Sequence, residues 1–569
     1  MSRQYFLHGT FLAFSLFVSA CSGTPSTNSG DSDHEVRSSA IRGGETSSPT
    51  VSPLEGMTPE DAVRLAKQAT FGPDQQTIDH IVALGSASAW IDEQMTLKHS
   101  TYEDLAQPIP ANICTGKTGQ DMANCNRDNY TSVPMVMRFY KNAIGGDDQL
   151  RQRTAFALSQ ILVASDLQVH ITSGLARYNQ ILMENAFGNY RDILASITTN
   201  PFMGNYLSMA YNNKFSPNEN YARELFQLFS IGTAMLNADG TPQSDASGTE
   251  IAAYTNSDVK EAARALTGWV YAPFEAPVAT DDYTKPMIPS PTRFDAGAKT
   301  FLNTKISANA TQQENVNAVI DAVFNHPNCA PFVSKRLIQQ LVVANPSPAY
   351  VKRVATVFIN NGSGVRGDLK AVIKAILTDP EARSTSSFPG KLKEPVLLAT
   401  SLARAIGFTT DGYAFYARDA ELGQRPFSAP SVFNYYPYNF PLPQGQGLVS
   451  PTSKLMTTAF STNRHNLVYD WTIEADQIRS EFQPLSTLRG ATGTQTHWSD
   501  WEALGQDQDK LLDRINLLLL NGTMTATQRQ SLSTAMASVK DSSPSTQIRK
   551  RVQVAFYIVA SSPMFQVDR

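Results

Sequence analysis

The chain has 569 residues, of which 41% are hydrophobic, so it can bury a large core. Its 47 Lys and Arg nearly balance 51 Asp and Glu, and removing residues 1–20 with their one Arg leaves 46 against 51, a net charge of −5. This balance argues against a nucleic-acid partner, which requires a basic footprint.

The first 20 residues have the layout of a secretory signal peptide. Arg3 precedes a mostly apolar run over residues 5–18, which is shorter than the roughly 20 apolar residues of a membrane span. The run ends in Val18-Ser-Ala-Cys21, the pattern of a bacterial lipobox, in which the Cys is lipidated. We expect residues 1–20 to be removed and Cys21 to carry the lipid anchor. The alternative is an ordinary signal peptide followed by an incidental Cys.

Residues 21–53 are expected to be the lipidated Cys and a flexible tether. The segment after Cys21 is rich in Ser, Thr, Gly and Pro and has too few apolar residues to fold. The residue after the Cys is Ser22 and not Asp, as in Gram-negative lipoproteins of the outer membrane. We therefore expect a lipid-anchored protein of the cell envelope, at the outer membrane, with one large domain over residues 54–569.

Three further Cys lie in this domain. Cys114 and Cys125 flank a short polar segment, and in an exported protein such a pair favours a disulfide over two free thiols. Cys329 is left over and is expected to be a small buried apolar residue. The Cys-x-x-Cys spacing of a structural zinc site does not occur.

Helical periodicity dominates the chain. Thr58-Pro-Glu-Asp61 is typical of a helix start, with a capping hydroxyl, Pro in the first turn and acids at the positive end of the dipole. Helices are expected near 61–70, 74–85, 87–97, 148–165, 174–187, 190–198, 203–210, 218–232, 254–269, 312–325, 331–343, 348–360, 368–378, 391–406, 452–466, 507–520, 526–538 and 545–560.

Two segments rich in Pro interrupt this pattern. Residues 271–308 are expected to be irregular, with a short hairpin near 293–302, and residues 424–450 to form an ordered aromatic loop. The predicted fold class is mainly α: a large multi-helix globular body with long ordered loops and at most a small β-hairpin.

Two of the expected helices carry clustered charges. They are Asn218-Glu-Asn-Tyr-Ala-Arg-Glu-Leu-Phe-Gln-Leu-Phe-Ser-Ile-Gly232 and Tyr254-Thr-Asn-Ser-Asp-Val-Lys-Glu-Ala-Ala-Arg-Ala-Leu-Thr-Gly-Trp269. Asn220, Arg223 and Glu224 share one face of the first, and Glu261 and Arg264 lie one turn apart on the second, because positions three and four apart are neighbours. If the helices pair, Arg223 meets Glu261 and Glu224 meets Arg264.

This cluster has two interpretations. It is either a pocket in which carboxylates and guanidinium groups converge for binding or catalysis, or a structural ion-pair network that fixes helix packing. Asp295 and Lys299, in a compact polar turn, would line the same pocket or lie on an exposed hairpin.

Metal catalysis is disfavoured, because the His residues are scattered and none has a partner at ligand spacing. We predict no metal and no cofactor. His465 and Arg425, the latter in the aromatic loop, are candidate binding residues; the alternative is that both serve packing or lie on the surface.

The two charged helices closely resemble the hallmark of the bacterial family named domain of unknown function 1800. The resemblance extends to Arg64-Leu-Ala-Lys-Gln-Ala-Thr-Phe-Gly-Pro73, Leu150-Arg-Gln-Arg-Thr-Ala-Phe-Ala-Leu-Ser-Gln160, Lys393-Glu-Pro395 and Leu422-Gly-Gln-Arg425. It covers most of residues 58–466, the family core, and leaves 467–569 as a helical C-terminal part.

This chain departs from the family pattern in two places. Many members have Phe-Trp-His where this chain has Leu158-Ser-Gln160, and many have a His where this chain has Phe294, before the Asp matched by Asp295. If those His residues are catalytic in relatives, this chain lacks them, which weakens the case for an enzyme.

Members of the family are typically exported, and their genes often lie beside those of the unknown-function 1501 family, which looks like secreted sulfatases and phosphatases. The resemblance therefore implies an envelope scaffold or accessory protein acting with a secreted sulfatase-like partner. The alternative is a hydrolase-like enzyme acting on an envelope or extracellular polymer, with a pocket formed by Arg223, Glu224, Glu261, Arg264 and Asp295.

Overall fold

The computed structural model of the chain describes residues 56–568, apart from 111, 274–280, 385–389, 443–444, 446, 477–478 and 489. The expected signal peptide and the whole of the expected tether, including Cys21 as the expected lipidation site, lie outside the described residues.

The described residues form a mainly helical body, as predicted, with 24 α-helices. The first half comprises α2 (Pro59–Ala69), α3 (Gln75–Leu84), α4 (Ala87–Gln94), α5 (Gly119–Tyr130), α6 (Val133–Gly145), α7 (Gln149–Ser159), α8 (Thr172–Glu184), α9 (Tyr190–Thr198), α10 (Pro201–Tyr206), α11 (Asn220–Gln227), α12 (Asn256–Ala265) and α13 (Gln312–Asn325). The second half comprises α14 (Cys329–Leu341), α15 (Pro348–Ile359), α16 (Leu369–Thr378), α17 (Pro380–Arg383), α18 (Pro395–Ile406), α19 (Tyr413–Asp419), α20 (Thr458–Thr472), α21 (Ser499–Leu504), α22 (Gln508–Leu520), α23 (Ala526–Ser538), α24 (Pro544–Ala560) and α25 (Pro563–Gln566).

Strands occur only as short antiparallel pairs in the part of the chain that is described. They are β1 (Trp269–Val270) with β4 (Ile288–Pro289), β2 (Ala272–Pro273) with β3 (Asp281–Asp282), β5 (Lys299–Phe301) with β6 (Thr304–Ile306), β7 (Lys391–Leu392) with β10 (Val567–Asp568), and β8 (Thr409–Thr410) with β9 (Thr494–Gln495). One hairpin was predicted near 293–302, and the hairpin in this region is β5–β6, a few residues further on.

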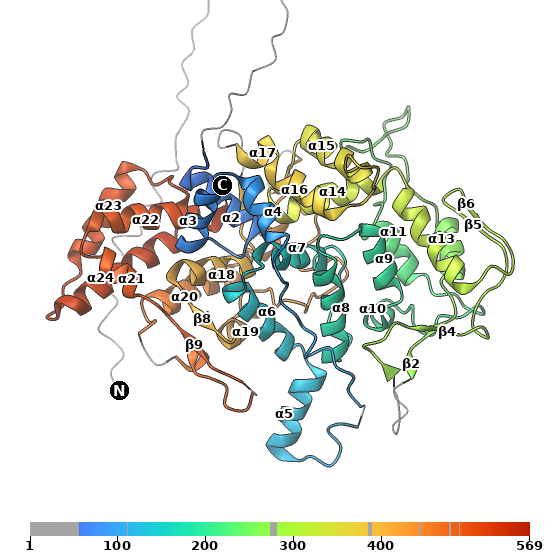
Figure 1. Ribbon diagram of the computed structural model, residues 1–569, viewed down its shortest axis with the longest axis horizontal. Coiled ribbons are helices and arrows are strands. Elements are labelled where there is room, and N and C mark those ends of the chain that lie inside the picture. Colours follow the sequence, from blue (N-terminus) through green and yellow to red (C-terminus); the bar gives the residue numbers. More distant parts are fainter. Residues whose placement is uncertain are drawn as a thin grey trace, which may run out of the picture.

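The chain folds back on itself, so that its C-terminal helices lie beside its first ones. Figure 1 shows α20–α24 at one end of an elongated body and α13 with the β5–β6 hairpin at the other, while α2, α7 and α18 lie between. Helix α22 packs on α2 and α18, and α24 packs on α20. One continuous apolar core runs through the body and includes Trp90, Trp471 and Trp501.

Local sequence signals explain many helix boundaries. The Thr58 hydroxyl caps α2 by accepting from the Asp61 N–H at 3.2 Å, with Pro59 in the first turn. Gly85 ends α3 with a φ of 76°, a conformation that favours Gly. Helices α13 and α23 have the predicted bounds.

Other boundaries depend on partners that are distant in the sequence. Helix α18 begins at Pro395 and not at 391, because residues 391–392 pair with the strand at 567–568. Helix α5 was not predicted, because Cys125 is its one buried residue and no apolar stripe marks it. Within the described residues, the helices are too short or too polar to cross a bilayer.

Candidate functional site

The two hallmark helices, α11 and α12, pack against each other, but the predicted ion pairs between them are wrong. Arg223 pairs with Glu219, the residue that precedes α11, at 2.8 Å. Arg264 pairs with Glu261, one helical turn earlier, at 2.8 Å. It also pairs at 2.8 Å with Asp295, in the loop between β4 and β5. Each guanidinium group pairs with a carboxylate three or four residues away, and Arg264 pairs with Asp295 as well, so neither pairs with the neighbouring helix.

Arg264 connects α12 to the β5–β6 region. Its Nε and Nη2 donate to the two carboxylate oxygens of Asp295, and its Nη1 donates to Glu261 and to the Ala298 carbonyl. Burial would raise the pKa of Asp295, but the hydrogen bonds from Arg264 and the Gly297 N–H outweigh it, so the pKa is lowered. Asp295 is therefore an anion held in place.

Lys299 lies beneath this ion pair. Its ammonium donates to the carbonyls of Asp295 and Gly297 at 2.5 and 2.8 Å, and its side chain is 1% exposed. Burial lowers its pKa, against the attraction of Asp295. The structure places Glu261, Arg264, Asp295 and Lys299 together, and their charged groups bond to one another and to backbone carbonyls of the turn.

Glu224 does not join this cluster. It is half-buried on α11, and its Oε2 atom makes no hydrogen bond within the described residues. Burial raises its pKa, partly offset by Arg223. Asn220 is exposed at the start of α11, and its N–H donates to the Asn218 side chain at 2.9 Å.

The remaining predicted residues lie on other elements. Arg425, in the loop after α19, pairs with Asp419 at 2.8 Å and lies 4.1 Å from the centre of the Tyr416 ring. His465 is half-buried on α20, and burial followed by the charge of Arg464 lowers its pKa. Helix α20 and helix α11 are in different parts of the body, so His465 and Glu224 do not share a site (Figure 1).

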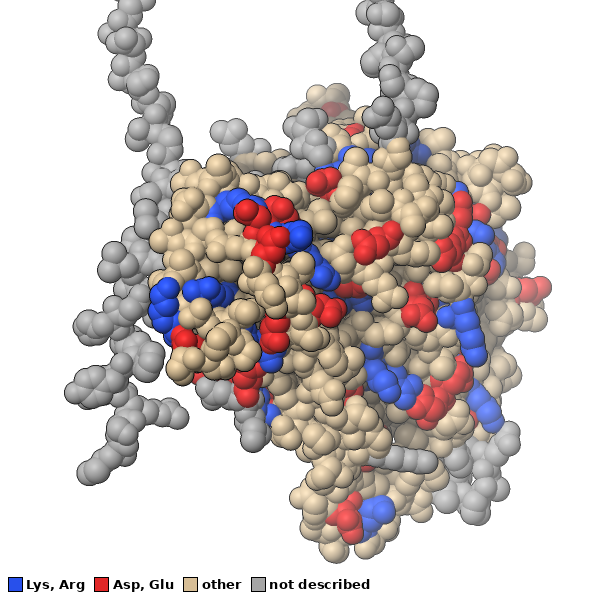
Figure 2. Space-filling view, turned by 60° about the vertical axis from the view of Figure 1, so that its left-hand side comes forward, with Lys and Arg blue, Asp and Glu red and all other residues tan. Residues whose placement is uncertain are grey.

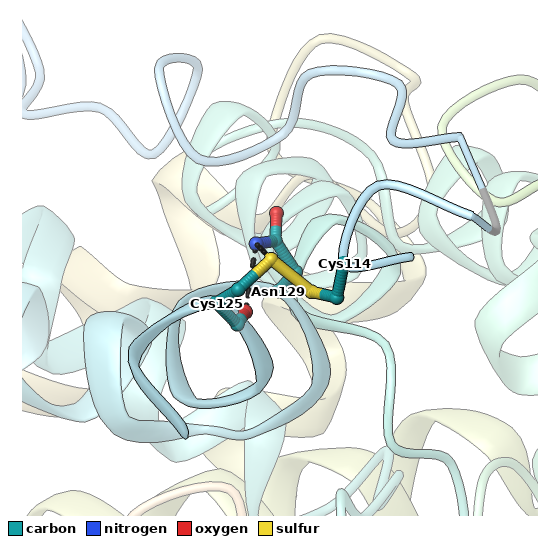
Figure 3. Close-up of a disulfide and its surroundings, with 3 residues drawn as sticks. All are labelled: Cys114, Cys125 and Asn129. Atoms are coloured by element: carbon teal, nitrogen blue, oxygen red, sulfur yellow. Dashed lines mark hydrogen bonds between the residues drawn. A yellow bond between two sulfur atoms is a disulfide. The ribbon is translucent and has the colours of Figure 1, made fainter. Parts of the chain in front are cut away.

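The predicted disulfide between Cys114 and Cys125 is confirmed (Figure 3). Asn129, one turn along α5, donates to the Cys125 carbonyl at 2.8 Å and approaches its sulfur at 3.7 Å. Cys329 is a buried free thiol, as expected. Beside the disulfide lies an open groove of about 610 Å³, lined by residues that include Cys114, Asn126, Tyr130 and Tyr283.

A site that the sequence reasoning missed surrounds Glu394, at the start of α18. This carboxylate is fully buried and takes its hydrogen bonds from neutral groups. The Gln424 amide donates to Oε2 at 2.5 Å, the Tyr436 hydroxyl lies 3.0 Å from the same atom, and the Gln160 amide lies 3.4 Å from Oε1. Asn434 completes the network by donating to Gln160 at 3.0 Å.

Six cationic side chains, each at least nine-tenths buried, surround this network. We call them the cationic chamber: Arg64 and Lys67 on α2, Arg153 on α7, Lys391 and Lys393 on or beside β7, and Arg464 on α20. Burial, the largest cause in each case, lowers the pKa of Lys67 to about 7, of Lys391 to about 8 and of Arg464 to about 10. On the surface, by contrast, Figure 2 shows basic and acidic side chains lying next to one another.

Backbone carbonyls hold these cations in place. Arg153 and Lys391 both donate to the Gln340 carbonyl, at 2.8 and 2.5 Å. Lys393 donates to the Phe565 carbonyl and pairs with Asp568 at 2.7 Å. Helix α2 near the start, β7 in the middle and β10 near the end of the described chain thus meet in one place.

The chamber draws on most of the segments that carry the family resemblance outside the hallmark. They supply Arg64 and Lys67, then Arg153 and Gln160, then Lys393 and Glu394, then Gln424. No single segment has a recognisable chemical motif, so local spacing gave no sign of the site. The sequence feature that could have indicated the site is that each segment places a basic or amide residue within an apolar helix or at its end.

The fold and these two clusters define a large, mainly helical body in which a group of charged side chains is buried. The family described as "Protein of unknown function (DUF1800)" matches residues 64–567, and the chain belongs to that family. The match continues well past residue 466. No curated protein and no solved structure matches the chain.

Proposed function

We propose that the chain is an exported, lipid-anchored scaffold or accessory protein of the cell envelope, at the outer membrane, which acts with a secreted sulfatase-like protein. The observation that carries the proposal is the satisfied Arg264 cluster. The hallmark residues hold α12 to the following hairpin, which is what a structural element requires.

Two other features support export and anchoring. A disulfide persists in an oxidising compartment, and the chain forms one between Cys114 and Cys125. The lipobox ending at Cys21, followed by Ser22, supports a lipid anchor directed to the outer membrane. The partner is supported by the family resemblance, because genes of family members often lie beside those of the unknown-function 1501 family.

Cys21 gives the test of anchoring. We expect the native chain in the membrane fraction and the Cys21→Ser variant either retained as an unprocessed precursor or released to the soluble envelope fraction, without incorporation of labelled fatty acid. Fatty-acid labelling that persists in Cys21→Ser would overturn the anchor at this residue.

The scaffold role is tested by placing a tag after Arg569, crosslinking intact cells and identifying what co-purifies. We expect a stoichiometric sulfatase-like protein of the envelope. Recovery of the chain alone, at all crosslinker concentrations, would contradict the proposal and favour the enzyme.

One observation favours the enzyme as the second candidate. The half-buried Glu224 has a raised pKa and a carboxylate oxygen that accepts no hydrogen bond from the described residues, which suits a general acid. A hydrolase acting on an envelope or extracellular polymer through Glu224 would lose its activity in Glu224→Gln while keeping its melting temperature. As a scaffold, the chain keeps its partner in the same variant, because Glu224 supports no ion pair with Arg264.

A further inference from the structure

A small cavity lies inside the cationic chamber, between α2, α7 and β7. Arg64, Lys67, Arg153, Lys391 and Asp568 supply its charged lining. The remaining lining is mainly apolar. The volume open to the centre of a water-sized sphere is about 10 Å³, which is about the volume that one bound water or an ion of similar size requires.

The nearby carboxylates are Asp61, Asp568, which itself lines the cavity, and Glu394, whose hydrogen bonds come from neutral groups. Asp61 forms an ion pair with Arg64 at 2.8 Å, and Asp568 forms one with Lys393 at 2.7 Å. Lys67, Arg153 and Lys391 have no carboxylate within 4 Å among the described residues. Three cations thus face the cavity without a described carboxylate at ion-pair distance, although Asp568 and Glu394 attract them from further away. A buried charge without a partner in contact costs several kcal/mol.

The cations also have unused hydrogen-bond donors. Arg153 is fully buried, and its Nε and Nη1 atoms have no partner within the described residues. Lys67 is 8% exposed and makes no hydrogen bond to a described residue. A buried donor without an acceptor costs about 1–3 kcal/mol, so an acceptor that fits the cavity would be bound favourably.

We propose that this cavity binds one water-sized inorganic anion of the halide class, with chloride as the common example. A halide accepts hydrogen bonds from several directions and supplies a negative charge in direct contact with the three cations. A water molecule has two acceptor positions and no charge, so it leaves the cations uncompensated. A tetrahedral oxoanion such as phosphate or sulfate is several times larger than the available space.

The bound anion joins elements that are far apart in the sequence. Lys67 and Arg64 come from the first described helix, Arg153 from α7, and Lys391 from the strand that pairs with residues 567–568. The anion is therefore a structural ligand, and its affinity appears as a contribution to folding stability.

The first test compares the stability of the full chain in chloride and in gluconate at one ionic strength. We expect the native chain to have a higher melting midpoint in chloride, and Lys67→Met to lose most of that difference. Removing one charge-assisted donor is expected to weaken halide binding roughly 10- to 100-fold. Lys67→Met is chosen because it removes a buried charge, whereas Arg153→Met also removes a bond to Gln340 that the fold uses.

Lys98→Met is the matched control, since Lys98 is exposed on the surface and should leave the chloride effect unchanged. Crystals grown in bromide provide the second test. An anomalous peak among Lys67, Arg153 and Lys391 supports the proposal. An equal chloride effect in Lys67→Met and the native chain would overturn it, as would a cavity that holds only water or nothing when bromide is present.

Discussion

Lys67 places an ammonium group in a buried site, where burial disfavours its charged form. Burial is the largest cause lowering its pKa to about 7; Lys393 and Arg64 add to the effect, and Asp568 opposes it. The neighbouring Lys391, whose pKa is about 8, and Arg153 face the same cavity. The folded chain therefore binds the Lys67 proton less readily than the unfolded chain, whose Lys has a pKa near 10.5.

This shift predicts a direction for stability against pH. Between about pH 7 and pH 10.5 the unfolded chain holds a proton that the folded chain lacks, so the free energy of unfolding rises with pH through that window. In halide-free buffer we expect denaturant unfolding of the native chain to show this rise. Lys67→Met should be more stable at pH 7, by on the order of a few kcal/mol, and its pH slope should be smaller. If the free energy of unfolding rose equally with pH in Lys67→Met and in the exposed Lys98→Met, the role of Lys67 in this pH dependence would be refuted.

Single residues differ in how well the sequence predicts them. Cys114 and Cys125 were predicted as a disulfide because their spacing and the expected export suffice. Glu394 was seen only as part of a helix start, because its network with Gln160, Gln424 and Tyr436 joins residues 30 to 276 positions apart. Burial of a charge depends on the whole fold, which local spacing does not encode.

At the scale of elements, the Arg264–Asp295 pair fixes α12 against the hairpin that follows it. Asp295→Asn should lower the free energy of unfolding by about 1–3 kcal/mol, since it weakens hydrogen bonds to a charged, largely covered group. Amide hydrogen exchange in β6 should speed up in the same variant.

The control for this prediction is Asp321→Asn. Asp321 pairs with Arg191 at 2.6 Å, but its side chain is 46% exposed, so solvent screens the pair. We expect a cost below about 1 kcal/mol. Equal losses of unfolding free energy in the two variants would show that the Arg264–Asp295 pair contributes no more than an ordinary surface ion pair.

Helix α5 depends on its disulfide more than on packing. Cys125 is its one buried residue, and the disulfide closes a loop with a sequence separation of 11. In a chain-entropy account such a loop is worth roughly 3 kcal/mol, and that loss should fall on α5 alone. Replacing both Cys by Ser should expose residues 112–131 to limited proteolysis while the melting midpoint changes little. A midpoint that falls without new cleavage there would contradict this account.

Elements whose stability is local were predicted best. Helices α13 and α23 have capping boxes and match their expected bounds, whereas α5 has no apolar stripe and was missed. Helix α6 was also missed, although it is amphipathic: Arg138, Lys141 and Asn142 share its polar face, and most of its other side chains are buried. The strand pair β7–β10 joins residues 391–392 to 567–568 and has no local signal.

At the scale of the whole molecule, the C-terminal part is built into the body. Trp501 on α21 donates to the Ala405 carbonyl on α18 at 3.1 Å, and its ring packs against Phe556 on α24. Lys393 pairs with Asp568, and Arg464 donates to the Gln566 side chain at 3.0 Å. The end of the family core expected near residue 466 therefore cuts through the apolar core and the cationic chamber of one body.

This arrangement predicts that a chain ending at residue 466 does not fold. It would expose the apolar faces of α2 and α18 that α22 covers, and it would leave Lys393 and Arg464 buried without their partners at 566 and 568. We expect such a chain to aggregate in size-exclusion chromatography. A chain beginning at residue 54 should keep the native melting midpoint, because it removes only the expected leader and tether. A monodisperse 54–466 chain with one cooperative unfolding transition would show instead that the C-terminal helices form a separate domain.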